Sequence, residues 1–365
     1  MRKVAAANGS LPRVAHLTGN FTSEAPLSPA VREAISAALE QGWGDPKKQS
    51  QASARAAILL DSAKGEIAST LGTSSDRLEV IGEPSLLHYI ALMGFHRNDS
   101  TLYTSTVDLG KIRAVARSHS DASQEIGVDH EGRYLLDSVK VSKKSVISIQ
   151  VCNGETGVTQ KLEKWREHSS HVVLDATRSL ITNTSVTGFA ATTFDATSWN
   201  GPSGLGFLAL GDPKSFIYPL PHIAPIRVPG SYSIPLLVGS AIALSEFLLS
   251  QEKLKELRKL LVTSLSGISG ITILAIESGS ESRHLSALVD GYSSEEVLRS
   301  LLHKGVSVDA GSACSPEDLT PSHVIASMGF PTQGHLRFTL HPGHTAEDIS
   351  QLAKTLSEVL EELRS

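Results

Sequence analysis

Residues 145–158 read Ser-Val-Ile-Ser-Ile-Gln-Val-Cys-Asn-Gly-Glu-Thr-Gly-Val, and residues 171–179 read His-Val-Val-Leu-Asp-Ala-Thr-Arg-Ser. Each stretch begins with the β-branched residues typical of a buried strand and ends in polar or glycine residues typical of a loop. Strands of this kind predict a mostly parallel sheet with helices on both faces. Ligands of such sheets sit beyond the carboxyl ends of the strands. The loops after Val151, Leu174 and Phe194 are therefore the first candidates for a functional site.

Further strands and helices alternate along the first two thirds of the chain. Short β-branched runs predict strands at 78–81, 101–104, 145–151, 171–174 and 205–208. Apolar residues at helical spacing predict helices at 31–39, 53–71, 86–95 and 111–117. Pro29 stands near the start of the first of these helices, where its missing N–H costs little. This alternation predicts a large α/β domain.

The pattern changes after residue 235. A long helical region at 235–266 precedes strands at 270–276, 284–288, 306–309 and 335–339, with helices at 293–303 and 346–363. Residues 229–235, which contain Pro229, Gly230 and Pro235, suit a hinge. We therefore expect a large domain at 15–234 and a small α+β domain at 235–365, with residues 1–14 packing nearby.

Composition excludes some classes of binding partner and indicates the cellular compartment. The chain has 365 residues, a net charge of −5, a pI near 6.3 and 40% hydrophobic residues. A slight acidic excess argues against nucleic acid or an anionic membrane as the main partner. Residues 1–13 lack the apolar run typical of a signal peptide, no apolar run is long enough to span a bilayer, and two cysteines suit a reducing compartment. We expect a cytoplasmic protein without a metal site, in which Cys152 belongs to the core.

Three more stretches complete a recognisable set of motifs. Residues 193–208 read Thr-Phe-Asp-Ala-Thr-Ser-Trp-Asn-Gly-Pro-Ser-Gly-Leu-Gly-Phe-Leu, residues 308–316 read Val-Asp-Ala-Gly-Ser-Ala-Cys-Ser-Pro, and residues 336–340 read Leu-Arg-Phe-Thr-Leu. In this order and spacing, the five stretches resemble the NifS/IscS-like cysteine desulfurases of the class V aminotransferase family. These enzymes use pyridoxal phosphate (PLP) to remove sulfur from cysteine as an enzyme-bound persulfide.

The resemblance extends over roughly residues 16–360. Gly44-Asp45-Pro46 with Ser53-Ala54-Arg55 is similar to the family's Asn-Pro-Ser…Gly-Arg-x-Ala-Arg segment, and Val128-Asp129-x-x-Gly132 to its Val-Asp-x-x-Gly turn. It implies the fold-type I architecture of PLP-dependent transferases, with a seven-stranded sheet in the large domain. It also implies a homodimer whose active sites lie at the subunit interface.

The resemblance assigns a role to each matching residue. Asp175 matches the carboxylate that holds the pyridine nitrogen of PLP protonated, and Arg178 replaces a glutamine that contacts the phenolic oxygen. Asn153 matches a residue near the cofactor and the substrate carboxylate. Arg337 matches the arginine that grips that carboxylate through a bidentate pair. Cys314 matches the nucleophile that carries the persulfide, which needs a thiolate in an exposed loop.

The sequence departs from the family where the cofactor would be attached. The family reads Ser-x-His-Lys before Gly-Pro-x-Gly; aligned on residues 201–204, Asp195 stands at the serine, Thr197 at the histidine and Ser198 at the lysine. Ser198 has no amine and cannot form an imine. The chain has no lysine between Lys164 and Lys214.

The phosphate side of the cofactor site departs as well. The family's Gly-Ala-Thr-Glu loop is replaced by residues 82–85, Gly-Glu-Pro-Ser, in which Pro84 removes a backbone donor and Glu83 adds a negative charge. Asp195 places another carboxylate where the phosphate would lie. The family's ring-stacking histidine, expected before Asp108, is replaced by Ser-Thr-Val.

Three hypotheses follow. We favour a family member that has lost PLP chemistry and acts as a binding or assembly partner, with Cys314 accepting sulfur from a true cysteine desulfurase or passing it to an acceptor protein. In the second, PLP is bound and Lys111 or a lysine of a partner subunit compensates. In the third, the crevice uses Asp195, Arg178, Arg337 and Cys314 on a small, amino-acid-like ligand.

Overall fold

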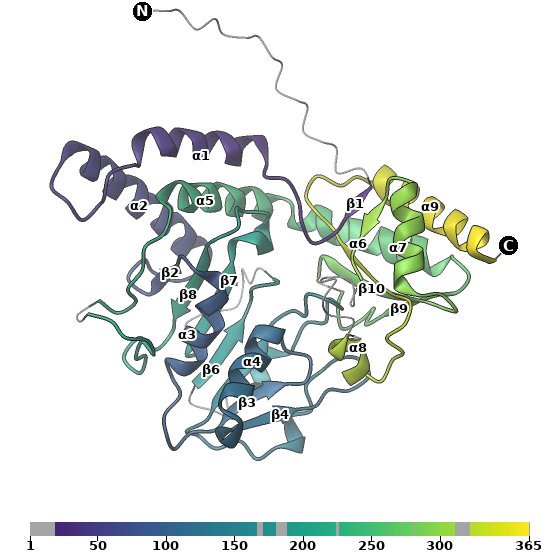
Figure 1. The fold of residues 1–365 in the computed structure, drawn as a ribbon, viewed down its shortest axis with the longest axis horizontal. Helices are drawn as coiled ribbons and strands as arrows, with labels where there is room; N and C mark the ends of the chain where they lie inside the picture. The colour runs from purple at the N-terminus through teal and green to yellow at the C-terminus, as the bar shows by residue number, and fades with distance from the viewer. Residues whose placement is uncertain are drawn as a thin grey trace, which may run out of the picture.

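A seven-stranded sheet forms the centre of the chain, with the strand order β2-β8-β7-β6-β5-β3-β4 (Figure 1). The computed structural model describes residues 19–165, 171–179, 188–223, 226–280, 282–310 and 322–364. Neighbouring strands are parallel except where β8 pairs with β2 and β7. The prediction of a mostly parallel sheet is thus confirmed. Its strands are β2 (Leu78–Ile81), β3 (Leu102–Ser105), β4 (Ser123–Ile126), β5 (Val146–Gln150), β6 (His171–Asp175), β7 (Ala191–Asp195) and β8 (Gly206–Leu210).

Two of these strands were not given bounds from the sequence: β4, which was not expected, and β7, of which only the end at Phe194 was expected. The edge strand β4 reads Ser-Gln-Glu-Ile and buries only Ile126, so it lacks an apolar run. The strand β7 reads Ala-Thr-Thr-Phe-Asp and is buried between β6 and β8 except at its end. Its threonines suit a strand, but a run this short carries a weak periodic signal.

Helices cover both faces of the sheet. The helices α3 (Leu87–Met93) and α4 (Gly110–Ser118) pack on one face through an apolar cluster that includes Ile90 and Ile112 (Figure 1). The helices α2 (Gln51–Thr70) and α5 (Ile234–Leu249) pack with α1 (Pro29–Gln41) on the other side. The side chain of Ser28 caps α1, with Pro29 in the first turn as predicted.

The C-terminal part is built on a three-stranded antiparallel sheet, β12-β10-β9. One further strand of this part, β11, forms a two-stranded parallel pair with the N-terminal strand β1. The bounds are β1 (Asn20–Phe21), β9 (Ile271–Leu274), β10 (His284–Val289), β11 (Ser307–Val308), β12 (His335–Thr339), α6 (Gln251–Ser266), α7 (Ser294–His303), α8 (His323–Ser327) and α9 (Ala346–Arg364). Short 3-10 helices are η1 (Pro84–Leu86), η2 (Ser120–Ala122), η3 (Leu136–Ser138), η4 (Leu162–Trp165) and η6 (Ala196–Trp199).

The helical region expected at 235–266 is two helices instead of one. The backbone N–H and the hydroxyl of Ser250 both donate to the carbonyl of Phe247, at 3.0 and 2.7 Å, and α5 ends there. The axes of α5 and α6 differ by 59°. No single helix within the described ranges has the length and hydropathy to cross a membrane. Only α5 and α6 taken together, as this bent pair, have that length and hydropathy.

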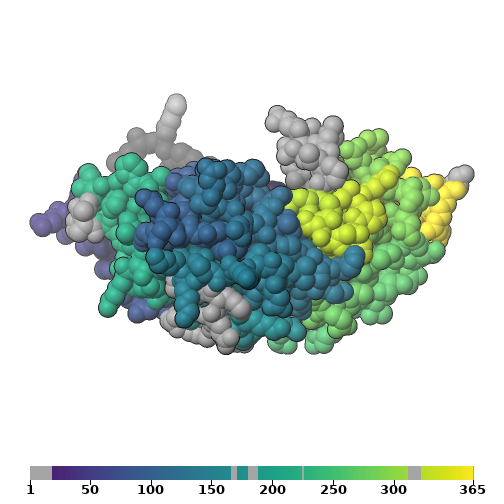
Figure 2. All heavy atoms as spheres, turned by 90° about the horizontal axis from the view of Figure 1, so that it is seen from below, coloured from purple at the N-terminus to yellow at the C-terminus, as the bar shows by residue number. Residues whose placement is uncertain are grey.

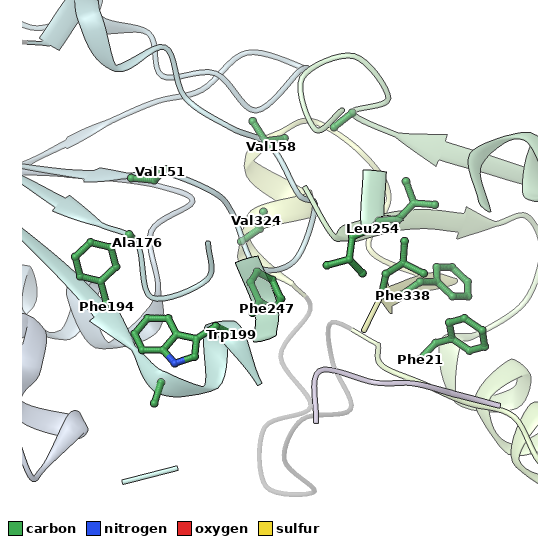
Figure 3. Packing of buried hydrophobic residues seen from close by; sticks show 14 of the residues in the cluster. Phe21, Val151, Val158, Ala176, Phe194, Trp199, Phe247, Leu254, Val324 and Phe338 are labelled. Carbon is green, nitrogen blue, oxygen red and sulfur yellow. The ribbon is translucent and has the colours of Figure 1, made fainter. Parts of the chain in front are cut away.

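The hydrophobic core continues from the large sheet into the C-terminal part. Figure 3 shows Phe194 and Trp199 on one side, Phe338 on the other, and Phe247 between them. The helix α5 packs on α1 and α2, and β1 pairs with β11, so contacts cross the domain boundary that we expect at residue 234. That boundary stays a prediction.

Candidate functional site

The carboxyl ends of the central strands bring the candidate residues to one edge of the large sheet. The parallel strands β5, β6 and β7 run directly into Asn153, Asp175 and Asp195, and β3 runs into Asp108. The strand register places Gln150 beside Asp175. The expectation that these loops meet is therefore confirmed, and the contacts of each residue decide what the edge can bind.

Asp175 is a buried carboxylate that receives several hydrogen bonds on a single oxygen. Its exposed fraction is 2%. Its Oδ1 accepts from the backbone N–H of Thr177 at 3.0 Å, the Thr177 hydroxyl at 2.6 Å and the Thr193 hydroxyl at 3.4 Å. The fourth hydrogen bond comes from a histidine: Nε2 of His88 lies 3.2 Å from the same oxygen and donates to it. These four residues are the Asp175 cluster.

The pKa of Asp175 reflects a balance between burial and this neighbour. Burial by itself raises the pKa of the carboxyl group, because the charged form loses its hydration. The charge and hydrogen bond of His88, with the hydrogen bonds of Thr177, outweigh burial and hold the pKa below its ordinary value. Asp175 is therefore charged at neutral pH, and one of its oxygens accepts a hydrogen bond from the chain's own imidazole.

His88 was not selected from the sequence, although a signal was present. It lies in α3, whose other buried residues are apolar: Leu87, Ile90, Ala91, Leu92 and Met93. Its exposed fraction is 5%. A histidine inside an apolar helix must find a polar partner when buried, and this requirement could have identified it.

The loop that carries Ser198 folds as the short helix η6. Asp195 caps it, because its Oδ1 accepts from the backbone N–H of Thr197 at 2.9 Å and from the Thr197 hydroxyl at 2.7 Å. Asn200 ends it in the left-handed conformation at φ 59°. The hydroxyl of Ser198 is buried and has no hydrogen-bond partner within the described ranges. Asp195 and Thr197, both predicted to face a cofactor phosphate, thus bond to each other.

Glu83 makes the same kind of contact at the start of η1. Its carboxylate accepts from the backbone N–H of Ser85 at 3.1 Å, and Pro84 occupies the first position of the helix. The strand β2 runs parallel to β7, since both pair antiparallel with β8, so η1 begins at the same edge of the sheet as η6. Two carboxylates of the chain therefore cap the two loops that the family uses for phosphate.

Asn153 is saturated by contacts within the protein. Its amide nitrogen donates to the carbonyl of Val107 at 3.1 Å and to the side chain of Gln150 at 2.9 Å. Its amide oxygen accepts from the backbone N–H groups of Glu155 and Thr156, each at 2.9 Å. These bonds hold the loop after β5 and leave the Asn153 side chain little capacity for a ligand.

Asp108 forms a second buried acid at this edge. The hydroxyl of Tyr134 donates to its Oδ1 at 2.5 Å, and the backbone N–H of Ser105 donates to its Oδ2 at 2.9 Å. Burial raises the pKa of Asp108 to about 7, although both hydrogen bonds lower it. Nε2 of His323, in α8, donates to the Asp108 carbonyl at 3.0 Å. In Figure 2, the yellow-green segment that includes α8 lies against the blue segment of the large sheet.

A small cavity, which we call the Arg337 cavity, opens beside these groups. Its volume is about 110 Å³, and its walls include Asp108, Asn153, Glu155, Arg178, His284, His323 and Arg337. Arg178 is exposed, and its side chain lies against Gly154. Nη2 of Arg337 forms an ion pair with Asp309 at 2.8 Å. Arg178, Arg337 and Asn153 thus line one cavity, with Arg337 already paired to Asp309, and their roles in binding stay a prediction.

Burial sets the protonation of the histidines around this cavity. It lowers the pKa of His284 well below its ordinary value, and three neighbouring guanidinium groups lower it further: those of Arg283, Arg337 and Arg178. Burial, with the charge of Arg337, lowers the pKa of His335 to about 3. These imidazoles are neutral at pH 7, so the arginines supply the positive charge of the wall. No cluster of three or more potential metal ligands occurs in the described part of the chain.

One of the two cysteines, Cys152, lies within the described residues. Cys152 is buried and free, and burial raises the pKa of its thiol to about 11. It is therefore an unreactive core residue, as predicted. Cys314, the predicted persulfide position, lies outside the described residues, as does the N-terminal segment 1–14.

Comparisons with known proteins agree on the family. The family model for class V aminotransferases matches residues 230–352. The chain is 25% identical to a protein named cysteine desulfurase IscS from Dictyoglomus turgidum, over 95% of each chain. It is 24% identical to a putative cysteine desulfurase IscS from Bacillus subtilis, covering 94% of this chain and 98% of that one.

Solved structures show the same fold. A NifS-like protein superposes with a TM-score of 0.81 at 20% identity, covering 94% of this chain and 99% of the other. A NifS-like protein from Rickettsia africae superposes with a TM-score of 0.79 at 16% identity, covering 93% and 99%. At these identities the likeness establishes the architecture, which is the fold predicted for a PLP-dependent transferase.

Proposed function

Because this chain is a NifS/IscS-like homologue of the class V aminotransferases, we propose that it keeps the fold of a cysteine desulfurase and acts without covalently bound PLP. Its role in this proposal is that of a binding or assembly partner in sulfur transfer. The contact between His88 and Asp175 carries the proposal. It uses, within the chain, one oxygen (Oδ1) of the carboxylate that the family resemblance assigns to the ring nitrogen of the cofactor.

The other anchor points of PLP support the same conclusion. Ser198 stands where the resemblance places the imine-forming lysine, and a hydroxyl cannot take that role. Asp195 and Glu83 cap the loops that would receive the phosphate. Two like charges 4 Å apart repel by about 4 kcal/mol at an effective dielectric constant near 20. The residues present therefore do not fit PLP.

The proposed sulfur transfer needs only the thiol of Cys314. Its thiolate would attack the outer sulfur of a donor persulfide, so that a new S–S bond forms at Cys314 and the donor leaves as a thiolate with the electron pair of the broken bond. No oxidant is consumed, because one persulfide replaces another. The donor in this proposal is a true cysteine desulfurase, or Cys314 passes the sulfur to an acceptor protein. We propose a homodimer, as in the family.

Two measurements on the purified chain test this proposal. We expect the protein to stay colourless after incubation with PLP and to gain no mass on borohydride reduction. After incubation with an active cysteine desulfurase and cysteine, we expect a trapped persulfide on Cys314.

The chain offers a matched control for the persulfide. The signal should persist in Cys152→Ala, because that thiol is buried, and disappear in Cys314→Ala. A yellow protein with an imine-linked pyridoxal on any residue, Lys111 included, would refute the proposal. A colourless protein that never carries the persulfide would refute its sulfur-transfer half.

The Arg337 cavity favours a second candidate, a site for a small amino-acid-like ligand. Its volume suits a small amino acid, and its walls carry the charges of Arg178 and Arg337 opposite Glu155. In this candidate, a ligand carboxylate would take the place of Asp309 on Arg337. Cysteine should then raise the melting temperature of the protein. This rise should be lost in Arg337→Gln and kept in Arg299→Gln, which changes an exposed arginine on α7.

A further inference from the structure

A second cavity, which we call the α7 pocket, opens where α7 lies beside the paired strands β1 and β11 (Figure 1). Its volume is about 560 Å³, which is within the range of cavities that bind small molecules. Among the described residues, Ser23 alone lines both this pocket and the Arg337 cavity. The α7 pocket is therefore a separate site. Its walls are Thr22, Ser23, Glu24, Leu298, Leu302 and residues 306–310.

One part of the wall of the α7 pocket is apolar. Leu298 and Leu302 stand four residues apart on α7 and therefore on the same face of this helix. Val306 and Val308 add two more apolar side chains from the segment of β11. Leu302 is 65% exposed. Because covering such apolar surface removes it from water, this wall suits the hydrocarbon part of a ligand.

The polar part of the pocket carries negative charge. Oδ2 of Asp309 accepts from the backbone N–H of Ser23 at 2.7 Å and from Nη2 of Arg337 at 2.8 Å. Its second oxygen, Oδ1, has no hydrogen-bond partner within the described ranges. Glu24 is exposed, and no lysine, arginine or histidine occurs among the described residues of the wall. A cation is therefore favoured over an anion in this pocket.

The backbone of the strands at the pocket is already hydrogen-bonded along both edges of β1. The carbonyl of Thr22 accepts from Nε2 of His341 at 2.8 Å. The carbonyl of Asn20 accepts from Nε2 of His344 at the same distance. On its other edge, β1 pairs with β11, which is bridged in turn to β12 at Asp309. Since an extended peptide cannot add to these strands as a further strand, the pocket recognises its ligand through side chains, which suits a small molecule.

We propose that the α7 pocket binds a small organic ammonium ion with an apolar body. The apolar body packs on Leu298 and Leu302. The ammonium group donates to Oδ1 of Asp309, whose other oxygen keeps its contact with Arg337, and Glu24 adds a second negative charge. This site is separate from the proposed function and goes beyond it.

Three probes that differ in their charged group test the proposal. The compounds 2-phenylethylamine, 2-phenylethanol and 3-phenylpropionate share a ring and a short chain, and they are cationic, neutral and anionic at neutral pH. In calorimetric titrations of the full chain, the amine should bind about tenfold more tightly than the alcohol, because it adds a hydrogen bond between charged groups. The propionate should bind more weakly than the alcohol. Equal affinities, or no saturable binding of the amine up to about 10 mM, would overturn the proposal.

Two variants at exposed residues test whether the amine is bound in the α7 pocket. Glu24→Gln removes one charge and should weaken binding of the amine by about twofold to threefold, without an effect on the alcohol. Leu302→Ser removes part of the apolar wall and should weaken the amine and the alcohol alike, by about threefold. The matched control is Leu249→Ser, which changes a leucine that is 90% exposed on α5 and should alter neither affinity.

A variant of Asp309 removes the main charge of the site. In Asp309→Asn, affinity for the amine should fall by about tenfold, and its preference over the alcohol should be lost. This change also breaks the ion pair with Arg337, so the two exposed variants decide the question if Asp309→Asn does not fold. Amine binding that is undiminished in both Glu24→Gln and Leu302→Ser would show that the inference is wrong. That outcome leaves the proposed function untouched, because it is read from colour and from a persulfide on Cys314.

Discussion

The Asp175 cluster and the Arg337 cavity lie at the same edge of the large sheet, yet the cluster is buried and the cavity is open. At the cluster, a carboxylate with 2% exposure is hydrogen-bonded by an imidazole from a buried helix. At the cavity, Arg178 is exposed beside about 110 Å³ of space. The difference teaches that one edge of a sheet can be closed by its own side chains at one place and open at another. The closed half contributes to stability, and the open half is available for a ligand.

The largest expected effect on stability comes from removing the carboxylate of the Asp175 cluster, the closed half. Asp175→Ala leaves His88 buried without its partner and removes the acceptor of Thr177. The free energy of unfolding should fall by about 3–5 kcal/mol, as for other buried pairs that lose one member. Urea denaturation measures it, with Asp137→Asn, an exposed aspartate on η3, as the control. A loss below about 1 kcal/mol would show that the pair is not the anchor of this region.

Acidification should act with opposite sign on the buried histidines and on the buried acid Asp108. His335 and His341 have pKa values of about 3 in the folded chain, against about 6.5 when unfolded. The unfolded state therefore binds more protons below pH 6.5, and stability falls by about 1.4 kcal/mol per pH unit for each group. The pKa of His284 is lowered as well. Asp108, raised to about 7, acts in the opposite direction between pH 7 and its unfolded value.

The histidines outnumber this acid, so the chain should be less stable at pH 5 than at pH 7. Urea denaturation at pH 7, 6 and 5 gives the slope, and we expect His341→Gln to reduce it. A variant at the buried acid, Tyr134→Phe, removes the hydroxyl that donates to Asp108 and should leave the contribution of the histidines intact. Stability that is equal at pH 5 and pH 7 in the wild type would contradict these assignments.

The smallest effect is expected at the loop between the two halves. Asp195→Ser restores the residue that the family has at this position, and serine can still cap η6, so the free energy of unfolding should change by less than about 1 kcal/mol. Loss of the carboxylate should nevertheless strengthen the binding of inorganic phosphate, which calorimetry can detect. Asp195→Asn, which keeps the shape and loses the charge, should behave like Asp195→Ser. If neither variant gains phosphate affinity, the carboxylate is not what excludes an anion.

The regular elements were largely predictable because their signals are local. The strands at 78–81 and 335–339 have the predicted bounds, since each is a short buried run between polar residues. The break at Ser250 was missed because apolar spacing continues on both sides of it. The position of Asp175 followed from the rule that parallel strands end at one edge. Its pairing with His88 did not, because it joins residues on different elements.

The hydrogen-bond and ion-pair partners of the site residues could also be found only from the structure. The sequence indicated that Arg337 and Asn153 belong to the site, but it could not show that Asp309 pairs with the arginine or that Val107 and Gln150 occupy the amide. These contacts depend on where loops cross above the sheet. The identity of each residue predicted where its side chain lies, and only the structure showed whether the polar atoms of that side chain are already hydrogen-bonded.

The pairing of β1 with β11 has a consequence for how the chain is made. Asn20 and Phe21 lie beside Ser307 and Val308, and the ring of Phe21 stacks on His344 at 4.5 Å. A ribosome therefore releases Phe21 long before its partners exist, and the strand must wait, exposed, until almost the whole polypeptide has emerged. Such late closure of distant segments is slow and leaves apolar surface open to aggregation. The pairing of β1 with β11 can therefore form only after nearly the whole chain has been synthesised.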